Sequence, residues 1–164
     1  MTTYATFHCY TPTDIANAYG LSQFMGAHAG DPAALGAGQT IVLVDAYGSP
    51  TAAADLKFFH DTFFPKAPAP NFDQVYPNGI LTYNNTAAGN GLSGPSAAAG
   101  WSGEATLDIE WAYAMAPLAH IVLMATNPAE TLGVQGLPNM FKAISDAIDT
   151  YPAGTVFSQS FGTA

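Results

Sequence analysis

Two apolar runs of the chain show no alternation between hydrophobic and polar positions. They cover residues 40–45 and 120–125, and both contain β-branched residues. Such runs are typical of strands that are buried on both faces of a sheet. Residues 154–162 predict a third strand. Residues 65–100 are dense in Pro, Gly and Asn and read mostly as loop, with one candidate strand at Ile80–Tyr83.

Helical spacing of apolar positions predicts three main helices among these strands. They cover residues 49–63, 103–115 and 138–149. We expect the apolar face of the first to consist of Leu56, Phe59 and Phe63, and that of the third to consist of Met140, Phe141, Ile144 and Ile148. A short capped helix at residues 11–20 precedes them, and residues 26–39 read as a loop rich in Gly and Ala.

Strands that alternate with helices predict an α/β fold, with a parallel sheet flanked by helices. In such sheets functional residues gather at the carboxyl ends of the strands. Asp45 and the segment Ser160-Phe161-Gly162 fall at two such ends. A three-stranded parallel sheet leaves its edges unpaired, so we expect residues 1–164 to be the truncated N-terminal portion of a larger domain.

The charge balance of the chain excludes some classes of partner. Hydrophobic residues make up 49% of the sequence, charged residues make up 9%, and the formal net charge is −9. This balance argues against binding nucleic acid or an anionic membrane surface. Because the chain has few cations, protonation of its carboxylates at low pH creates little self-repulsion, which is compatible with an acidic habitat.

Several signals that would indicate other functions are missing from the sequence. The N-terminus lacks the basic start and apolar core of a signal peptide, and no apolar run is long enough to span a bilayer. The histidines have no ligand-like mutual spacing, so we expect no metal site in this segment. The first predicted strand is followed by Asp45-Ala46-Tyr47-Gly48-Ser49-Pro50 and not by a nucleotide-binding glycine motif.

Glu104 and Asp108 are the most informative polar residues of the chain. They are four residues apart, so on a helix both carboxylates lie on one face. Two such groups near a buried site share a proton and form an acid/base device that works below neutral pH. The alternative is a solvated acidic helix face. Glu110 lies about 120° around the helix from Glu104, so we give it no catalytic role.

Four segments, in order, resemble the sedolisin family, the serine-carboxyl peptidases. Residues 100–110 resemble its catalytic helix, with the pattern G-E-x-x-L-D, and residues 114–121 continue it as A-x-A-P-x-A-x-I. Residues 10–20 are similar to the start of the mature catalytic domain, and residues 38–47 are similar to its first core strand. Ser158-Gln159-Ser160-Phe161-Gly162 is similar to the family's S-x-S-[WYF]-G strand.

The resemblance implies a subtilisin-like α/β fold and cleavage of peptide bonds at acidic pH. It makes Glu104 the general base and Asp108 the carboxylate that supports it. A histidine base is protonated at about pH 3–4 and cannot accept a serine proton there, whereas a carboxylate beside a second one still can. The resemblance also implies a secreted, extracellular enzyme that acts on peptide or protein substrates.

Further site residues follow from the same resemblance. Asp45 corresponds to an acidic position that extends the hydrogen-bond network of the carboxylates in some members; otherwise it is an ordinary polar residue at a strand end. Ser160, Phe161 and Gly162 correspond to the strand that pairs with the substrate backbone; otherwise they form a plain core strand. Trp101 is a candidate wall of a substrate pocket, or else a packing anchor.

The chain departs from the family pattern in one important respect. It contains no G-T-S-x-x-x-P nucleophile segment and no later G-D segment with the oxyanion-stabilising Asp. The calcium site of the family also belongs to the C-terminal part, so no cofactor is expected in this segment. We therefore expect these residues to be inactive alone and to need the C-terminal remainder as a partner. The alternative is a non-catalytic, peptidase-like binding or scaffold domain.

Overall fold

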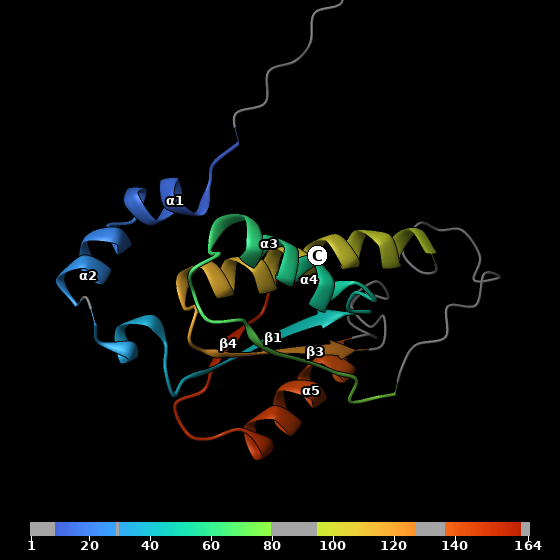
Figure 1. The fold of residues 1–164 in the computed structure, drawn as a ribbon. Helices are drawn as coiled ribbons and strands as arrows, with labels where there is room; N and C mark the ends of the chain where they lie inside the picture. Colours follow the sequence, from blue (N-terminus) through green and yellow to red (C-terminus); the bar gives the residue numbers. More distant parts are fainter. Residues whose placement is uncertain (1–8, 29, 80–94, 127–136, 162–164) are drawn as a thin grey trace, which may run out of the picture.

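A parallel sheet forms the centre of the molecule. The computed structural model describes residues 9–28, 30–79, 95–126 and 137–161. Its described strands are β1 (Thr40–Ala46), β2 (Asn71–Val75), β3 (His120–Thr126) and β4 (Val156–Ser158). They pair in parallel in the order β2-β3-β1-β4, as Figure 1 shows for the labelled β1, β3 and β4. The predicted α/β class and the parallel sheet are confirmed.

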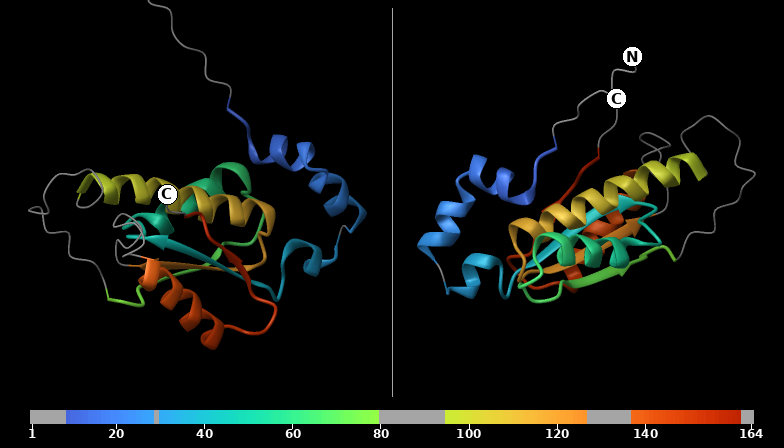
Figure 2. Two further views of the ribbon diagram at one scale, coloured as in Figure 1. Left: turned by 180° about the vertical axis from the view of Figure 1, so that it is seen from behind. Right: turned by 45° about the horizontal axis from the view of Figure 1, so that its top comes forward.

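Three helices cover the two faces of this sheet. The helices α3 (Ala52–Phe63) and α4 (Pro95–Met115) lie on one face, and α5 (Leu137–Thr150) lies on the other (Figures 1 and 2). The short helices α1 (Pro12–Ala18) and α2 (Leu21–Ala27) lie to one side, before the 3-10 turn Pro32–Leu35 that leads into β1. Among the described helices, none combines the length and the apolarity that crossing a bilayer requires.

Alternation along the strands divides the core into two layers. Leu43, Ile121 and Leu123 point toward α3 and α4, where they pack with Ile109 and Tyr113. The residues between them on the strands pack against α5; they are Val42, Val44, Val122 and Met124. The continuous apolar runs of the sequence therefore reflect strands that are buried on both faces, as predicted.

The sheet has four described strands, so the prediction of three was wrong. The additional strand, β2, falls in a stretch that was predicted to be mostly loop. Its residues are exposed or half-buried. Three of its five residues are polar, so its sequence lacks the run of β-branched and aromatic residues that predicts a strand. Pairing with β3 compensates for this weak local preference. The other candidate strand, Ile80–Tyr83, lies outside the described residues.

The ends of several elements also differ from the predictions. Helix α4 begins at Pro95 instead of Gly103, because a proline at a helix start and three following alanines favour helix through the two glycines. The predicted loop 26–39 contains the end of α2 and a 3-10 turn. The last strand covers Val156–Ser158 and not all of residues 154–162.

The apolar face of α5 was predicted incorrectly in part. Met140 is fully buried, but Phe141 and Ile148 are 56% and 61% exposed. The small side chains of Ala143 and Ala147 occupy the buried face instead, where they let the helix approach the sheet closely. On α3, Leu56 and Phe59 are buried as predicted, whereas Phe63 is 45% exposed.

Candidate functional site

The two predicted catalytic carboxylates lie along the flank of α4. Ala105 and Ile109 on this helix are fully buried, and Leu107 is 48% exposed. Glu104 and Asp108 occupy half-buried positions between these two extremes. The helix therefore holds both carboxylates on one face, as the spacing predicts, at the boundary between the core and the solvent.

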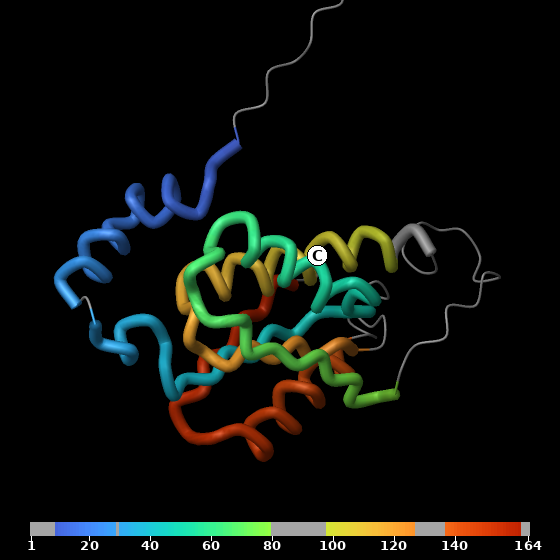
Figure 3. Tube along the Cα trace, in the orientation of Figure 1, coloured from blue at the N-terminus to red at the C-terminus, as the bar shows by residue number. Residues whose placement is uncertain are grey.

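Asp108 is hydrogen-bonded to a residue that follows the last described strand. The hydroxyl Oγ of Ser160 donates to Oδ2 of Asp108 over 2.9 Å, across 52 positions of sequence. This contact joins α4 to the segment after β4, which Figure 3 shows passing toward the α4 side of the sheet. Two of the predicted site residues are thereby brought together.

Glu104 and Asp108 are not linked directly within the part of the chain that the structure describes. No hydrogen bond joins their carboxylates there, and Asp108 accepts its bond from Ser160. Sharing of a proton between the two acids therefore stays a prediction. It needs the side chains to approach more closely, which neighbouring rotamers one helical turn apart allow.

Asp45 lies at the carboxyl end of β1 and is completely buried. It is two residues beyond Leu43, so alternation places its side chain on the face of the sheet that α4 covers. Its backbone carbonyl accepts a bond of 3.3 Å from the hydroxyl of Thr126. This position is compatible with the predicted role of Asp45, which is to extend the hydrogen-bond network of the carboxylates on α4. That role stays a prediction.

A tight turn follows Asp45 and ends the strand abruptly. Tyr47 has φ 61°, which is uncommon for a residue with a side chain, and Gly48 has φ 66°. The amide of Tyr47 donates to the carbonyl of Thr126 over 2.9 Å, so the turn is attached to the end of β3. This anchoring holds the carboxyl ends of β1 and β3 together beneath α4.

The other predicted site residues have structural surroundings. Trp101 and Phe161 are half-buried and pack against the α5-side cluster that contains Val42 and Val44. This environment favours the packing-anchor interpretation of Trp101. Residues 159–161 follow the end of β4, so the predicted substrate-pairing strand is shorter than expected. Gly162 lies outside the described residues.

Sequence reasoning missed a chain of hydroxyl groups that joins α4 to the start of α3. Ser102 on α4 donates to Ser49 over 2.8 Å, Ser49 is 3.1 Å from the hydroxyl of Thr51, and Thr51 donates to Asp55 over 2.7 Å. Ser49 is buried. The sequence signal was a serine three residues after a buried strand, but its partner is 53 positions away.

Glu110 also has an environment that the sequence did not indicate. Burial at the α3–α4 interface raises its pKa above the ordinary 4.5, and the nearby charge of Asp55 raises it further. Glu110 is therefore a carboxylic acid over a wider pH range than a solvated glutamate. It lies on the α3 side of α4 and is not part of the Asp108–Ser160 contact.

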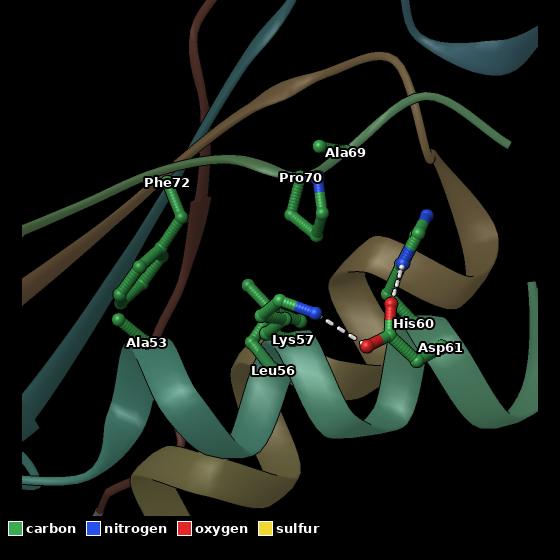
Figure 4. A pocket seen from close by; sticks show the side chains of 8 residues that line it. All are labelled: Ala53, Leu56, Lys57, His60, Asp61, Ala69, Pro70 and Phe72. Atoms are coloured by element: carbon green, nitrogen blue, oxygen red, sulfur yellow. Dashed lines mark hydrogen bonds and ion pairs between the residues drawn. The ribbon is translucent and has the colours of Figure 1, made fainter. Parts of the chain in front are cut away.

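A cavity of about 300 Å³ lies between α3 and the edge strand β2 (Figure 4). Its polar end holds His60, Asp61 and Lys57, and its walls include Leu56 and Phe72. Asp61 accepts hydrogen bonds from both Lys57 and His60, so its carboxylate offsets the charge of the lysine. None of the predicted site residues lines this cavity, and we do not assign the site to it.

No group of three or more His, Cys, Asp or Glu side chains in the described ranges is arranged to hold a metal ion. Comparisons with family models, with curated proteins and with solved structures found no match to this chain. The functional interpretation therefore depends on the geometry above and on the sequence motifs.

Proposed function

We propose that this chain supplies the acid/base half of a serine-carboxyl peptidase that cleaves peptide bonds at acidic pH. The observation that carries the proposal is the Asp108–Ser160 hydrogen bond. It sets the helix with the two carboxylates beside the segment that follows a strand at the carboxyl edge of the sheet. This edge is where open parallel sheets bind their ligands.

The proposed chemistry assigns one role to each carboxylate. Glu104 accepts the proton of a serine hydroxyl while the serine oxygen forms a bond to the carbonyl carbon of the peptide. Glu104 then gives that proton to the amine nitrogen as the peptide C–N bond breaks, and water hydrolyses the ester left on the serine, which regenerates the hydroxyl. Asp108 supports Glu104 by holding a proton between the two acids. Asp45, at the end of β1, extends the hydrogen-bond network of these two carboxylates. The serine comes from a G-T-S-x-x-x-P segment that these residues lack.

The fold is compatible with this proposal. A parallel sheet with two helices on one face and one on the other agrees with the subtilisin-like α/β fold that the resemblance implies. On this proposal residues 1–164 form the N-terminal portion of the catalytic domain, and the enzyme is secreted. The resemblance assigns calcium to the C-terminal part, and no mechanistic step here involves it.

The test uses the natural polypeptide that contains these residues, with a peptide substrate at about pH 3–5. We expect hydrolysis by the wild-type protein and at least about a hundredfold lower kcat for Glu104→Gln. Asp108→Asn is expected to lower kcat as well. Glu110→Gln is the matched control, because it removes a carboxylate from the same helix outside the proposed site.

Three results would contradict the proposal. If Glu110→Gln lost as much activity as Glu104→Gln, the acidic residues of α4 would affect activity only through folding. An inactive wild-type protein that still binds peptides would favour the non-catalytic binding or scaffold function instead. A pH optimum above about 7 would remove the reason for a carboxylate base, since a histidine serves there.

A further inference from the structure

Ser160 occupies a defined place relative to the sheet. Leu43 and Ser158 are the last residues that β1 and β4 pair with each other. Asp45 and Ser160 each lie two residues beyond that pair, so alternation directs both toward the α4 side. Phe157 and Phe161 point the other way, into the α5-side cluster. These two aromatic side chains anchor the segment on which Ser160 stands.

The hydrogen bond of Ser160 has a definite direction. An ionised carboxylate only accepts, so the serine Oγ–H donates to Oδ2 of Asp108 over 2.9 Å. The bond uses one lone pair of Oδ2 and leaves Oδ1 available to other groups. Hydrogen bonds to a charged group are stronger than those between neutral groups, and they restrict its rotation. Asp108 is half-buried and Ser160 is exposed, so the contact lies at the surface of the molecule.

We propose that Ser160 is a positioning residue that orients the Asp108 carboxylate toward Glu104. This inference rests on the proposed function, and it gives the Ser160 side chain a role different from substrate binding. The backbone of the segment remains available to a substrate, while the hydroxyl sets the angle of Asp108. A small change in the orientation of an acid/base group lowers the rate of the chemical step without weakening substrate binding.

The first test is kinetic and uses the natural polypeptide at its optimum pH. We expect Ser160→Ala to lower kcat about tenfold with KM changed less than about twofold, and Ser160→Thr to restore most of the rate, since threonine keeps the donor. Ser158→Ala is the matched control. Ser158 lies on the same side of the chain, and its hydroxyl has no hydrogen-bond partner among the described residues. A raised KM with unchanged kcat in Ser160→Ala would overturn the proposal.

A second measurement reports on the contact without any activity. Ser160→Ala is expected to lower Tm by about 2 °C in the wild-type background and to leave Tm unchanged in an Asp108→Ala background. Equal shifts in both backgrounds would show that the two side chains do not interact and would overturn the inference. This double-mutant cycle can show that Ser160 and Asp108 interact while the wild-type protein cleaves no peptide. In that case the proposed function fails, and the positioning role fails with it.

Discussion

Ser102 on α4 donates a hydrogen bond of 2.8 Å to Ser49, a buried serine in the turn between β1 and α3. From Ser49 the hydroxyl chain continues through Thr51 to the carboxylate of Asp55. Bonds in such a chain polarise one another, so each link is stronger than it would be alone. The chain therefore attaches the start of α3 to the part of α4 that carries Glu104.

Ser49→Ala should destabilise the protein by about 1–2 kcal/mol, because it removes the acceptor of Ser102 in a buried place. Urea unfolding at neutral pH measures the free energy of unfolding. Ser145→Ala, on the exposed side of α5, is the matched control and should change it by less than about 0.5 kcal/mol. Equal effects of the two substitutions would show that the hydroxyl chain contributes nothing to stability.

Glu110→Gln should stabilise the protein at pH 7 and have no effect at pH 3. Burial, and then the charge of Asp55, raise the pKa of Glu110, so the folded protein binds this proton more tightly than the unfolded chain does. The resulting stability is fully present below the unfolded pKa and is lost as pH rises through the folded pKa. A neutral glutamine avoids that loss, and we expect Tm at pH 7 to rise by about 2 °C.

The background of Asp55→Asn separates the two causes of this shift. Because burial is the larger cause, the gain from Glu110→Gln should shrink in this background but persist. Thermal unfolding of the four proteins at pH 3 and pH 7 measures both contributions. A destabilising effect of Glu110→Gln at pH 7 would mean that the ionised carboxylate is satisfied in the folded protein.

His60 should titrate above its ordinary pKa of 6.5. Its Nδ1 lies 2.9 Å from a carboxylate oxygen of Asp61, and its Nε2 lies 3.1 Å from the carbonyl of Ala67. Both partners are acceptors, so both ring nitrogens can donate only in the protonated form. The stability from these bonds is complete below about pH 6.5 and declines as pH rises through the folded pKa.

An NMR titration of the His60 ring protons measures this pKa directly. Asp61→Asn should lower it, since the hydrogen bond to Asp61 is the largest cause of the shift. Lys57→Gln should raise it slightly, because the lysine charge opposes protonation of the ring. A titration at or below 6.5 in the wild-type protein would show that the two bonds do not form together.

Gly48→Ala should be one of the more damaging single substitutions in the turn after β1. A Cβ at position 48 would lie 2.7 Å from the Cβ of Ala125, and φ there is +66°. We expect a loss of about 2–4 kcal/mol in the free energy of unfolding. Gly20→Ala is the control, with φ +71° but nothing within 4 Å, and should cost about 1 kcal/mol. Equal costs would mean that the close approach to Ala125 is relieved without strain.

The main elements of the fold followed from local patterns. The continuous apolar runs identified β1 and β3, because strands covered on both faces need apolar residues at every position. Helical periodicity identified α3 and α5, and the cap and stop signals of residues 11–20 identified α1. The edge strand β2 could not be identified in this way, since its half-exposed residues form a strand by pairing with β3.

For the candidate site, a four-residue spacing was enough to place Glu104 and Asp108 on one face of a helix, because helix geometry depends only on local backbone structure. Their partners were decided by the assembly of the sheet. Ser160 reaches Asp108 across 52 positions and Ser49 reaches Ser102 across 53, because parallel crossovers bring distant strand ends to one edge. Packing also decided which half of each apolar pattern is buried, as the exposed Phe141 and the buried Ala143 on α5 show.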